Sequence, residues 1–450
     1  MRRLRNRLRR RRVQRRYSRS KKDFSRQRKL TFGIVTLLIL RGHKMSLQNG
    51  LNKFFSALGK VFRVPTASAY SQARQKLDPE VFVYLRETMV ADFYELYCVE
   101  GLVRKWRGHR VLACDGTILN VMDNPQTRAE YFVQTNQPGN PVAVQAQSCV
   151  LYDLLNQVVV GATLGTRTGE KEHLLEKLGP QLGSGDLLIL DRLYADYKIL
   201  AQGVAGGWEV VVRLPKNSFK ESRALFKTGA KIPREKEITL ICPEKSRAYV
   251  RAQGLPESLT VRVVRVELKG GTIEVLATTL RDVSKYPAEE FKVLYGWRWN
   301  EETFFDRIKN IFDVERFSGI SPRVIQQDYF GVLFLATFAS ILAVTDQQAL
   351  AQKSSAPPES PGEAAAVPAR QPLAGSRQVN QSICYVALIE RVVEILLKKG
   401  SEEKVLDELH YLFRTSPIRA RPGRSFPRTM SQKRFRQQIR WQKYGKKIVA

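Results

Sequence analysis

Two aspartates, Asp115 and Asp191, each close an apolar stretch that predicts a strand, within residues 109–121 and 186–194. At the carboxyl ends of adjacent strands in an α/β sheet, side chains converge on one crevice. Two carboxylates there can hold two divalent ions about 4 Å apart, the geometry for in-line phosphodiester chemistry. One ion would activate a water or a 3′-hydroxyl, and the other would stabilise the leaving oxygen. Taken alone, an aspartate at a strand end is more often a simple turn residue.

A third carboxylate, Glu302, belongs to a polar stripe that also carries Tyr295, Arg298 and Lys309. Spacings of three, four and seven residues place these side chains along one face of a helix. Arg298 and Glu302 at this spacing would also suit an ordinary surface ion pair. A polar stripe without a function would be unusual on a helix that lies beside a strongly apolar sheet. The pattern therefore favours a metal-binding carboxylate flanked by groups that bind DNA phosphates.

Trp299 and Arg213 are further candidates for contacts with DNA. Trp299 follows Arg298 directly, and an indole can stack on an unpaired base of any kind. A core tryptophan explains Trp299 at least as well. Arg213 lies in the predicted strand 208–215.

Cysteine and histidine do not suggest a metal site. The five cysteines and four histidines are scattered, and no Cys-x-x-Cys pair is present. This usage is typical of a reduced, cytoplasmic protein without a disulfide framework or zinc knuckle. Any metal would therefore be held by carboxylates, which favours Mg²⁺ or, in its place, Mn²⁺.

The elements that must position these residues can be read from the hydrophobic pattern. Apolar runs predict strands and amphipathic runs predict helices in the order β-β-β-α-β-α-β over residues 109–215. This order implies a mixed sheet with helices on its faces, and so an α/β fold. A β-hairpin is predicted over 260–280, and a helix over about 287–309.

The net charge of +32 is concentrated at the two ends of the chain. Residues 1–29 hold 16 Lys and Arg against one acid, and residues 414–450 hold 12 and none. The rest holds 47 basic and 42 acidic residues, which is close to balanced. Basic arms on a balanced body favour a polyanion such as DNA, bound through counterion release. A solvated tail or an Arg-rich transit peptide is the alternative.

No segment is predicted to span a membrane. The apolar run 330–344 is shorter than the roughly 20 residues that a span requires, and a buried core helix explains it better. The complete domain plan predicted from the sequence is a basic disordered arm (1–29), a helical N-terminal DNA-binding region (30–105), the first part of the catalytic core (106–216), a β-rich insertion (217–285), the second part of the core with the glutamate helix (286–345), a linker or disordered loop (346–378), a C-terminal helical region (379–413) and a basic tail (414–450).

The polar stripe resembles a known signature. Tyr295-x2-Arg298-x3-Glu302-x6-Lys309 reproduces the Y-R-E-K pattern of the insertion sequence 4 family of DDE transposases. Residues 115–117 (DGT) and 190–194 (LDRLY) resemble the two aspartate motifs of that family, and segments 30–55, 68–77 and 421–428 are also similar to it.

This resemblance implies an RNase H-like core whose insertion lies between the last core strand and the glutamate helix. It also implies cut-and-paste movement of an insertion sequence, with cleavage at terminal inverted repeats and joining to target DNA. We further expect a homodimer in the DNA complex, two Mg²⁺ per site and a location at the nucleoid in the cytoplasm. Two alternatives remain, an RNase H-like nuclease and a DNA-binding protein derived from a transposase that has lost its chemistry.

Overall fold

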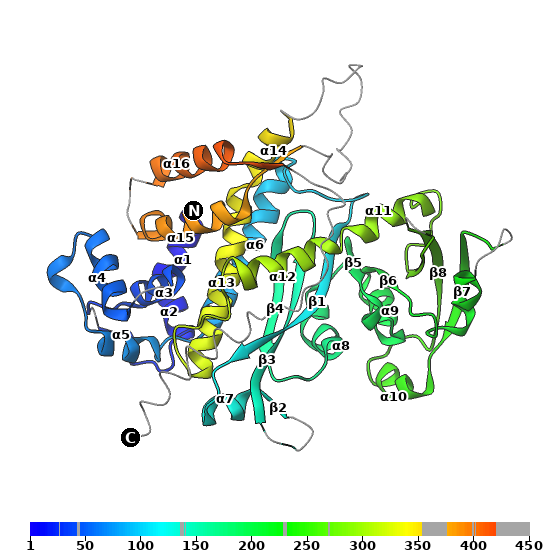
Figure 1. Cartoon of the computed structure of the whole chain (residues 1–450), viewed down its shortest axis with the longest axis horizontal. Coiled ribbons are helices and arrows are strands. Elements are labelled where there is room, and N and C mark those ends of the chain that lie inside the picture. Colours follow the sequence, from blue (N-terminus) through cyan, green and yellow to red (C-terminus); the bar gives the residue numbers. More distant parts are fainter. Residues whose placement is uncertain are drawn as a thin grey trace.

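One large sheet with helices on both faces forms the centre of the protein (Figure 1). The computed structural model describes residues 1–419 except 27, 43–45, 136–138, 140, 228–231, 269–270, 353–375, 398–399 and 401. Helices of the N-terminal and C-terminal regions gather at one end of the molecule, and the last strands of the sheet form the other end (Figure 1).

The described sheet has nine strands in the order β2-β3-β1-β5-β6-β9-β8-β7, and β4 pairs with β3. β1, β5 and β6 run parallel to one another, while β3 is antiparallel to both β1 and β4. The prediction of a mixed α/β core is therefore confirmed, and its arrangement is consistent with the RNase H-like core that we expect. The strands are β1 (Arg110–Val121), β2 (Phe132–Thr135), β3 (Pro141–Asp153), β4 (Val158–Gly165), β5 (Asp186–Leu190), β6 (Glu209–Arg213), β7 (Glu235–Ile241), β8 (Ser258–Glu267) and β9 (Ile273–Thr278).

Alternation along the central strands creates a hydrophobic core on each face of the sheet, because successive side chains point to opposite sides. Val111 and Ala113 of β1 belong to one buried cluster, whereas Leu112 belongs to the other. The first face is covered by α6 (Glu80–Val99) and α13 (Pro322–Leu342), which pack on each other and on β4. The second is covered by the segment from α8 (Glu170–His173) to α9 (Tyr197–Gly206).

The β-rich insertion extends the core sheet. β9 pairs antiparallel with β6, with Val211 opposite Thr278, and β8 and β7 follow outward. The predicted hairpin is present as β8 and β9, although residues 269–270 of its turn lie outside the described residues. The insertion also contains the helix α10 (Glu244–Ala252).

α13 accounts for the apolar run near residue 330. By length and composition alone it could cross a membrane, but 83% of that stretch is buried inside the protein. This burial is the pattern of a core helix, as the sequence predicts.

The N-terminal segment differs from the predicted disordered arm. Residues Arg2–Arg9 form α1 and Arg11–Arg16 form α2, and Leu4, Leu8 and Val13 are buried. Leu4 and Leu8 lie four residues apart on α1, so this helix has an apolar face that packs on the protein, and Val13 does the same for α2. The helical N-terminal region continues with α3 (Phe32–Arg41), α4 (Leu47–Ala57) and α5 (Ala67–Arg74).

The predicted linker over 346–378 is also partly wrong. Its first residues belong to α14 (Val344–Gln352), where buried Asp346 pairs with Arg414 and His410 of α16 (Glu402–Thr415). The Pro-rich part, residues 353–375, lies outside the described residues, as do residues 420–450 of the basic tail. The C-terminal region is helical as expected, in α15 (Gln381–Leu397) and α16.

Candidate active site

Asp115 and Asp191 lie beside each other at the centre of the sheet. β1 and β5 are parallel, with Ala113 opposite Ile189, so two residues further along each strand the register reaches the two aspartates. Asp115 lies within β1, and Asp191 directly follows β5. Asp115 accepts a hydrogen bond of 2.8 Å from the N–H of Gly116, and Asp191 caps the next turn through the N–H of Leu193.

Glu302 is carried to these aspartates by α12 (Trp299–Asn310), which packs against β1 (Figure 1). Phe304 of α12 stacks on Tyr152 of β3 at a centroid distance of 4.4 Å, which fixes the helix on the sheet. The Glu302 carboxylate accepts a hydrogen bond of 2.8 Å from the buried Arg298 guanidinium. Glu302 is therefore held by its own helix next to the strand that carries Asp115.

Electrostatics place the three carboxylates in one neighbourhood. Burial raises the pKa of Asp115 to about 6, and the negative charges of Asp191 and Glu302 act in the same direction. The Gly116 N–H and the Arg298 guanidinium oppose this rise. A buried carboxyl group whose pKa is raised by two neighbouring carboxylates favours a bound cation.

The stripe that carries Glu302 is not one continuous helix. α11 (Phe291–Gly296) ends before Trp297, and α12 begins at Trp299. Across the break the backbone stays right-handed but tightens, since the N–H of Arg298 bonds to the carbonyl of Tyr295, three residues back. The Arg298 guanidinium still lies 5.9 Å from the centre of the Tyr295 ring.

The other predicted DNA contacts lie in different surroundings. Lys309 donates a hydrogen bond of 3.0 Å to the carbonyl of Ile118 on β1. Trp299 is 56% exposed, so the reading as a core tryptophan is wrong, and Arg298 lies 5.2 Å from its ring. Arg213 forms an ion pair of 2.6 Å with Glu274 of the insertion.

Two acidic residues near Asp115 were not predicted from the sequence to belong to the site. Glu170, the first residue of α8, has its carboxyl group directly over Gly116. Glu301 is 1% exposed, and neither of its carboxylate oxygens has a hydrogen-bond partner among the described residues. Burial, and then the charge of Asp115, raises the pKa of Glu301 well above its usual range. The only available signal for Glu301 was its place beside Glu302, whereas nothing in the sequence links Glu170 to Asp115.

The chemistry of these side chains fits a hard divalent cation, because carboxylate oxygens are the preferred ligands of Mg²⁺ and Mn²⁺. Among the described residues, no group of three or more His, Cys, Asp or Glu is arranged to hold a metal ion as it stands. Glu302 is engaged with Arg298, and Asp191 with the backbone of its own turn. Side-chain rotation at these two positions would be needed to complete a ligand set.

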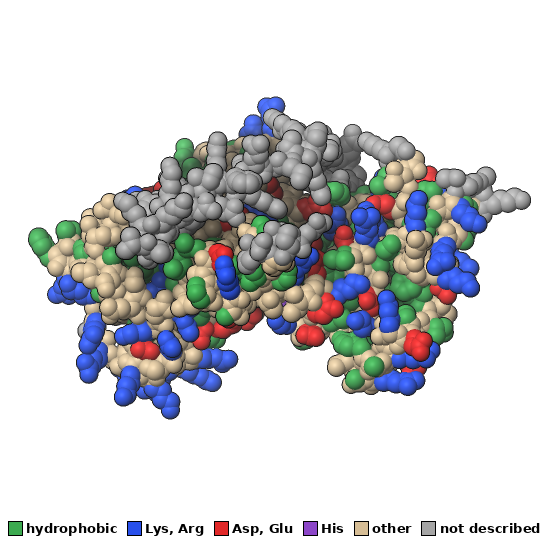
Figure 2. All heavy atoms as spheres, turned by 60° about the horizontal axis from the view of Figure 1, so that its bottom comes forward, with side chains coloured by type: hydrophobic (Ala, Val, Ile, Leu, Met, Phe, Trp, Pro, Cys, Tyr) green, Lys and Arg blue, Asp and Glu red, His purple; other side chains and the backbone are tan. Residues whose placement is uncertain are grey.

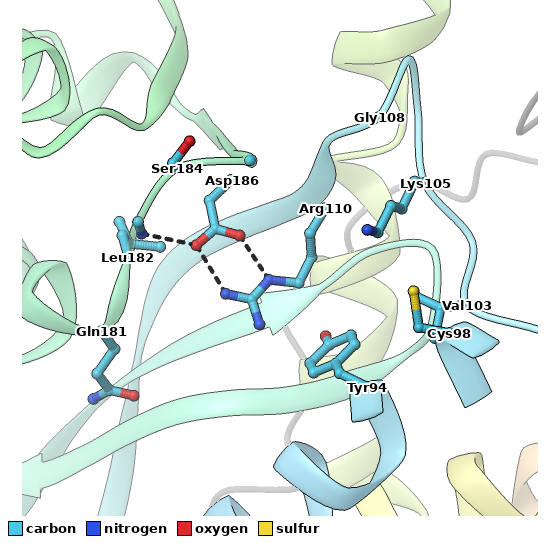
Figure 3. Close-up of a pocket in the computed structure, with 12 residues that line it drawn as sticks. Tyr94, Cys98, Val103, Lys105, Gly108, Arg110, Gln181, Leu182, Ser184 and Asp186 are labelled. Carbon is cyan, nitrogen blue, oxygen red and sulfur yellow. Dashed lines mark hydrogen bonds and ion pairs between the residues drawn. The ribbon is translucent and has the colours of Figure 1, made fainter. Parts of the chain in front are cut away.

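A hollow of about 470 Å³ lies at the opposite ends of the same strands (Figure 3). In it, Arg110 at the start of β1 forms two hydrogen bonds of 2.7 and 2.8 Å with Asp186 at the start of β5. The guanidinium also lies 4.8 Å from the centre of the Tyr94 ring. These contacts join the first residues of the two strands and so support the register that places Asp115 beside Asp191.

This chain is similar to known proteins in sequence and, more distantly, in structure. The family model described as "Transposase DDE domain" matches residues 106–338. "Transposase InsG for insertion sequence element IS4" of Escherichia coli (strain K12) is 28% identical over 273 residues, which cover 59% of this chain and 58% of that relative. The cryo-EM structure of a piggyBac transposase synaptic complex with hairpin DNA aligns with 88% of this chain and 78% of that one, at 12% identity and a TM-score of 0.38.

Proposed function

Because the chain belongs to the Transposase DDE domain family, we propose that it is a DNA transposase that cuts and joins DNA strands during cut-and-paste movement of an insertion sequence. The observation that carries the proposal is the register of β1 and β5, which sets Asp115 beside Asp191 under the helix that bears Glu302. Three carboxylates from two strands and a helix form a suitable acidic centre for phosphodiester chemistry.

In this proposal Asp115, Asp191 and Glu302 bind two Mg²⁺. When bound, such ions supply charge stabilisation for the attacking and leaving oxygens of an in-line displacement. Arg298 holds the Glu302 carboxylate in place before DNA arrives, and its buried position restricts the rotamers of both side chains. Lys309 lies along the same polar stripe, where a phosphate near the cut strand can reach it. Tyr295 is only 5% exposed, so a phosphate would contact it only after this part of the site opens.

The exposed indole of Trp299 is placed to stack on an unpaired base beside the cut. Its ring adjoins the Arg298 guanidinium, so base contact and carboxylate positioning would occur on one surface. Arg213 can contact DNA only if its ion pair with Glu274 opens. We also propose that two chains assemble on the terminal inverted repeats, and that the protein acts at the nucleoid.

The proposal is tested with purified protein, duplexes that carry the ends of its own element, and a target plasmid. We expect Mg²⁺-dependent cleavage at the ends followed by joining to the plasmid, and neither reaction in EDTA. Asp115→Asn should abolish both reactions, whereas Asp123→Asn, the same change at an exposed ion pair with Arg128, should leave both intact. Cleavage without joining would indicate a nuclease, and cleavage in EDTA would contradict the acidic centre.

A further inference from the structure

Glu170 occupies a space that only a glycine leaves open. A Cβ atom at position 116 would lie 2.3 Å from both the Cδ and the Oε1 atoms of Glu170, far inside contact distance. The φ angle of Gly116 is not positive, so an L-residue could adopt this backbone. Gly116 is therefore needed for the space above it, and that space holds the carboxyl group of Glu170.

Tyr194, in the turn that follows β5, holds this carboxyl group in place. Its hydroxyl donates a hydrogen bond of 3.3 Å to Oε2 of Glu170, and its ring is almost completely buried. Tyr194 belongs to the turn that starts at Asp191. The next residue of α8, Lys171, forms an ion pair of 3.3 Å with Asp196, just beyond that turn. Glu170 thus contacts both motifs, one residue after Asp115 and three after Asp191.

The charge of Glu170 is poorly compensated. It forms no ion pair with any residue that the structure describes, and Asp115 and Asp191 are the main charged groups that act on it. Arg167 acts in the opposite direction. Carboxylates gathered in this way without a cation between them repel one another, so the arrangement is suited to a positive ligand.

We propose that Glu170 is a fourth acidic residue of the cation site, and that its charge strengthens binding of the divalent ion held by Asp115 and Asp191. The inference rests on the proposed function and deepens it. It also explains two motif residues that metal binding alone leaves unexplained. Gly116 of the D-G-T motif makes room for Glu170, and Tyr194 of the L-D-R-L-Y motif positions it.

The first test measures Mn²⁺ binding to the DNA-free full-length protein, by the electron paramagnetic resonance signal of the free ion. Glu170→Gln keeps the shape and the bond to Tyr194 but removes the charge. We expect Mn²⁺ affinity to fall roughly 10- to 100-fold, as for other residues that support a metal ligand. Glu176→Gln, an equal charge loss at an exposed position of the same segment, should leave the affinity unchanged. Equal affinities for wild type and Glu170→Gln would overturn the inference.

The second test displaces Glu170 without changing any charge. In Gly116→Ala the new methyl group meets only the end of a flexible side chain, so the protein should fold while the carboxyl group moves away. We expect weaker Mn²⁺ binding in Gly116→Ala and little further loss when that change is added to Glu170→Ala. Full additivity of the two losses would show that Gly116 acts independently of Glu170, against the inference.

Asp115→Asn separates this inference from the proposed function. If wild type binds Mn²⁺ and Asp115→Asn does not, the cation site stands, and the result for Glu170→Gln decides the role of Glu170 alone. If wild type shows neither saturable Mn²⁺ binding nor DNA cleavage, the proposed function fails, and the inference fails with it.

Discussion

The acidic centre and the N-terminal helix α1 differ in how far their charges are neutralised by partners within the protein. In the centre, Asp115, Asp191 and Glu302 lie among like charges, with Arg298 as the close cation. On α1, three arginines have acidic partners: Arg3 and Arg7 pair with Asp92, and Arg5 pairs with Glu402 of α16 at 2.5 Å. Charges paired within the protein hold helices together, whereas crowded like charges are left for a ligand from outside.

The same contrast divides the N-terminal segment itself. Arg11, Arg12, Arg15 and Arg16 of α2 are exposed, and none forms an ion pair with another described residue. Lys and Arg side chains gather on the lower surface of the end of the molecule that holds these helices (Figure 2). We therefore expect the arginines of α1 to stabilise the fold and those of α2 to bind DNA.

The largest effect is expected from the carboxylates that are crowded together. Asp115→Asn or Glu302→Gln should lower the rate of strand cleavage by about 10³-fold or more, because a lost ligand removes several kcal/mol of charge stabilisation. Binding to end DNA, measured by gel shift in Ca²⁺, should stay within about threefold of wild type. Cleavage at wild-type rates in either variant would remove that residue from the centre.

Arg298 tests whether the cation that bonds to Glu302 needs a specific geometry. Arg298→Lys keeps the charge but loses the planar fork that bonds to Glu302 while lying over the Tyr295 and Trp299 rings. We expect cleavage to fall roughly 10- to 100-fold, the loss of one charged hydrogen bond. Arg128→Lys, at an exposed ion pair, is the control. Full activity of Arg298→Lys would mean that only the charge matters.

The apoprotein should be destabilised by its own acidic centre. The pKa of Asp115 is raised to about 6, so its protonated form is favoured in the folded state. Stability is therefore lost as the pH rises from about 4 to about 6, and it stays lower above that range. In EDTA at pH 7.5, Asp115→Asn should raise the free energy of unfolding by up to about 3 kcal/mol. In denaturant titrations this gain should shrink toward pH 4; a gain that did not depend on pH would contradict the cause given.

Arginines of α1 and α2 should separate stability from DNA affinity. Arg5 is buried and bonds to both Glu402 and the carbonyl of Ile395. Arg5→Ala should therefore cost roughly 2 kcal/mol of stability with DNA affinity retained.

Neutralising the four exposed arginines of α2 with glutamine should do the reverse. The salt dependence of DNA binding should fall by at most about 3.6 units, or 0.9 per phosphate contact. Stability should hardly change. If the α2 variant unfolded or kept the full salt slope, the division between the two helices would be wrong.

Much of the centre could be predicted because its signals are local. Short continuous apolar runs mark buried strands, and the aspartates that close them lie where parallel strands bring side chains together. The polar stripe likewise depends only on helical spacing. The broken helix had a signal too, since Gly296 precedes Trp297 and glycine weakens a helix at such a point.

Other features depend on contacts distant in sequence. Glu170 contacts Gly116 only because β1 and α8 come together in the fold, and no local sequence pattern predicts this contact. In α1 the abundance of arginine hides the spacing of Leu4 and Leu8, so charge alone suggested disorder. The partners of those arginines, Asp92 and Glu402, are 85 to 397 residues away.

The most direct test of the acidic centre is the anomalous scattering of Mn²⁺ in crystals of the protein bound to end DNA. We predict two Mn²⁺ peaks about 4 Å apart, in contact with Asp115, Asp191 and Glu302. Crystals in which the DNA is cut while Mn²⁺ lies at other residues, or is absent from these three, would contradict it.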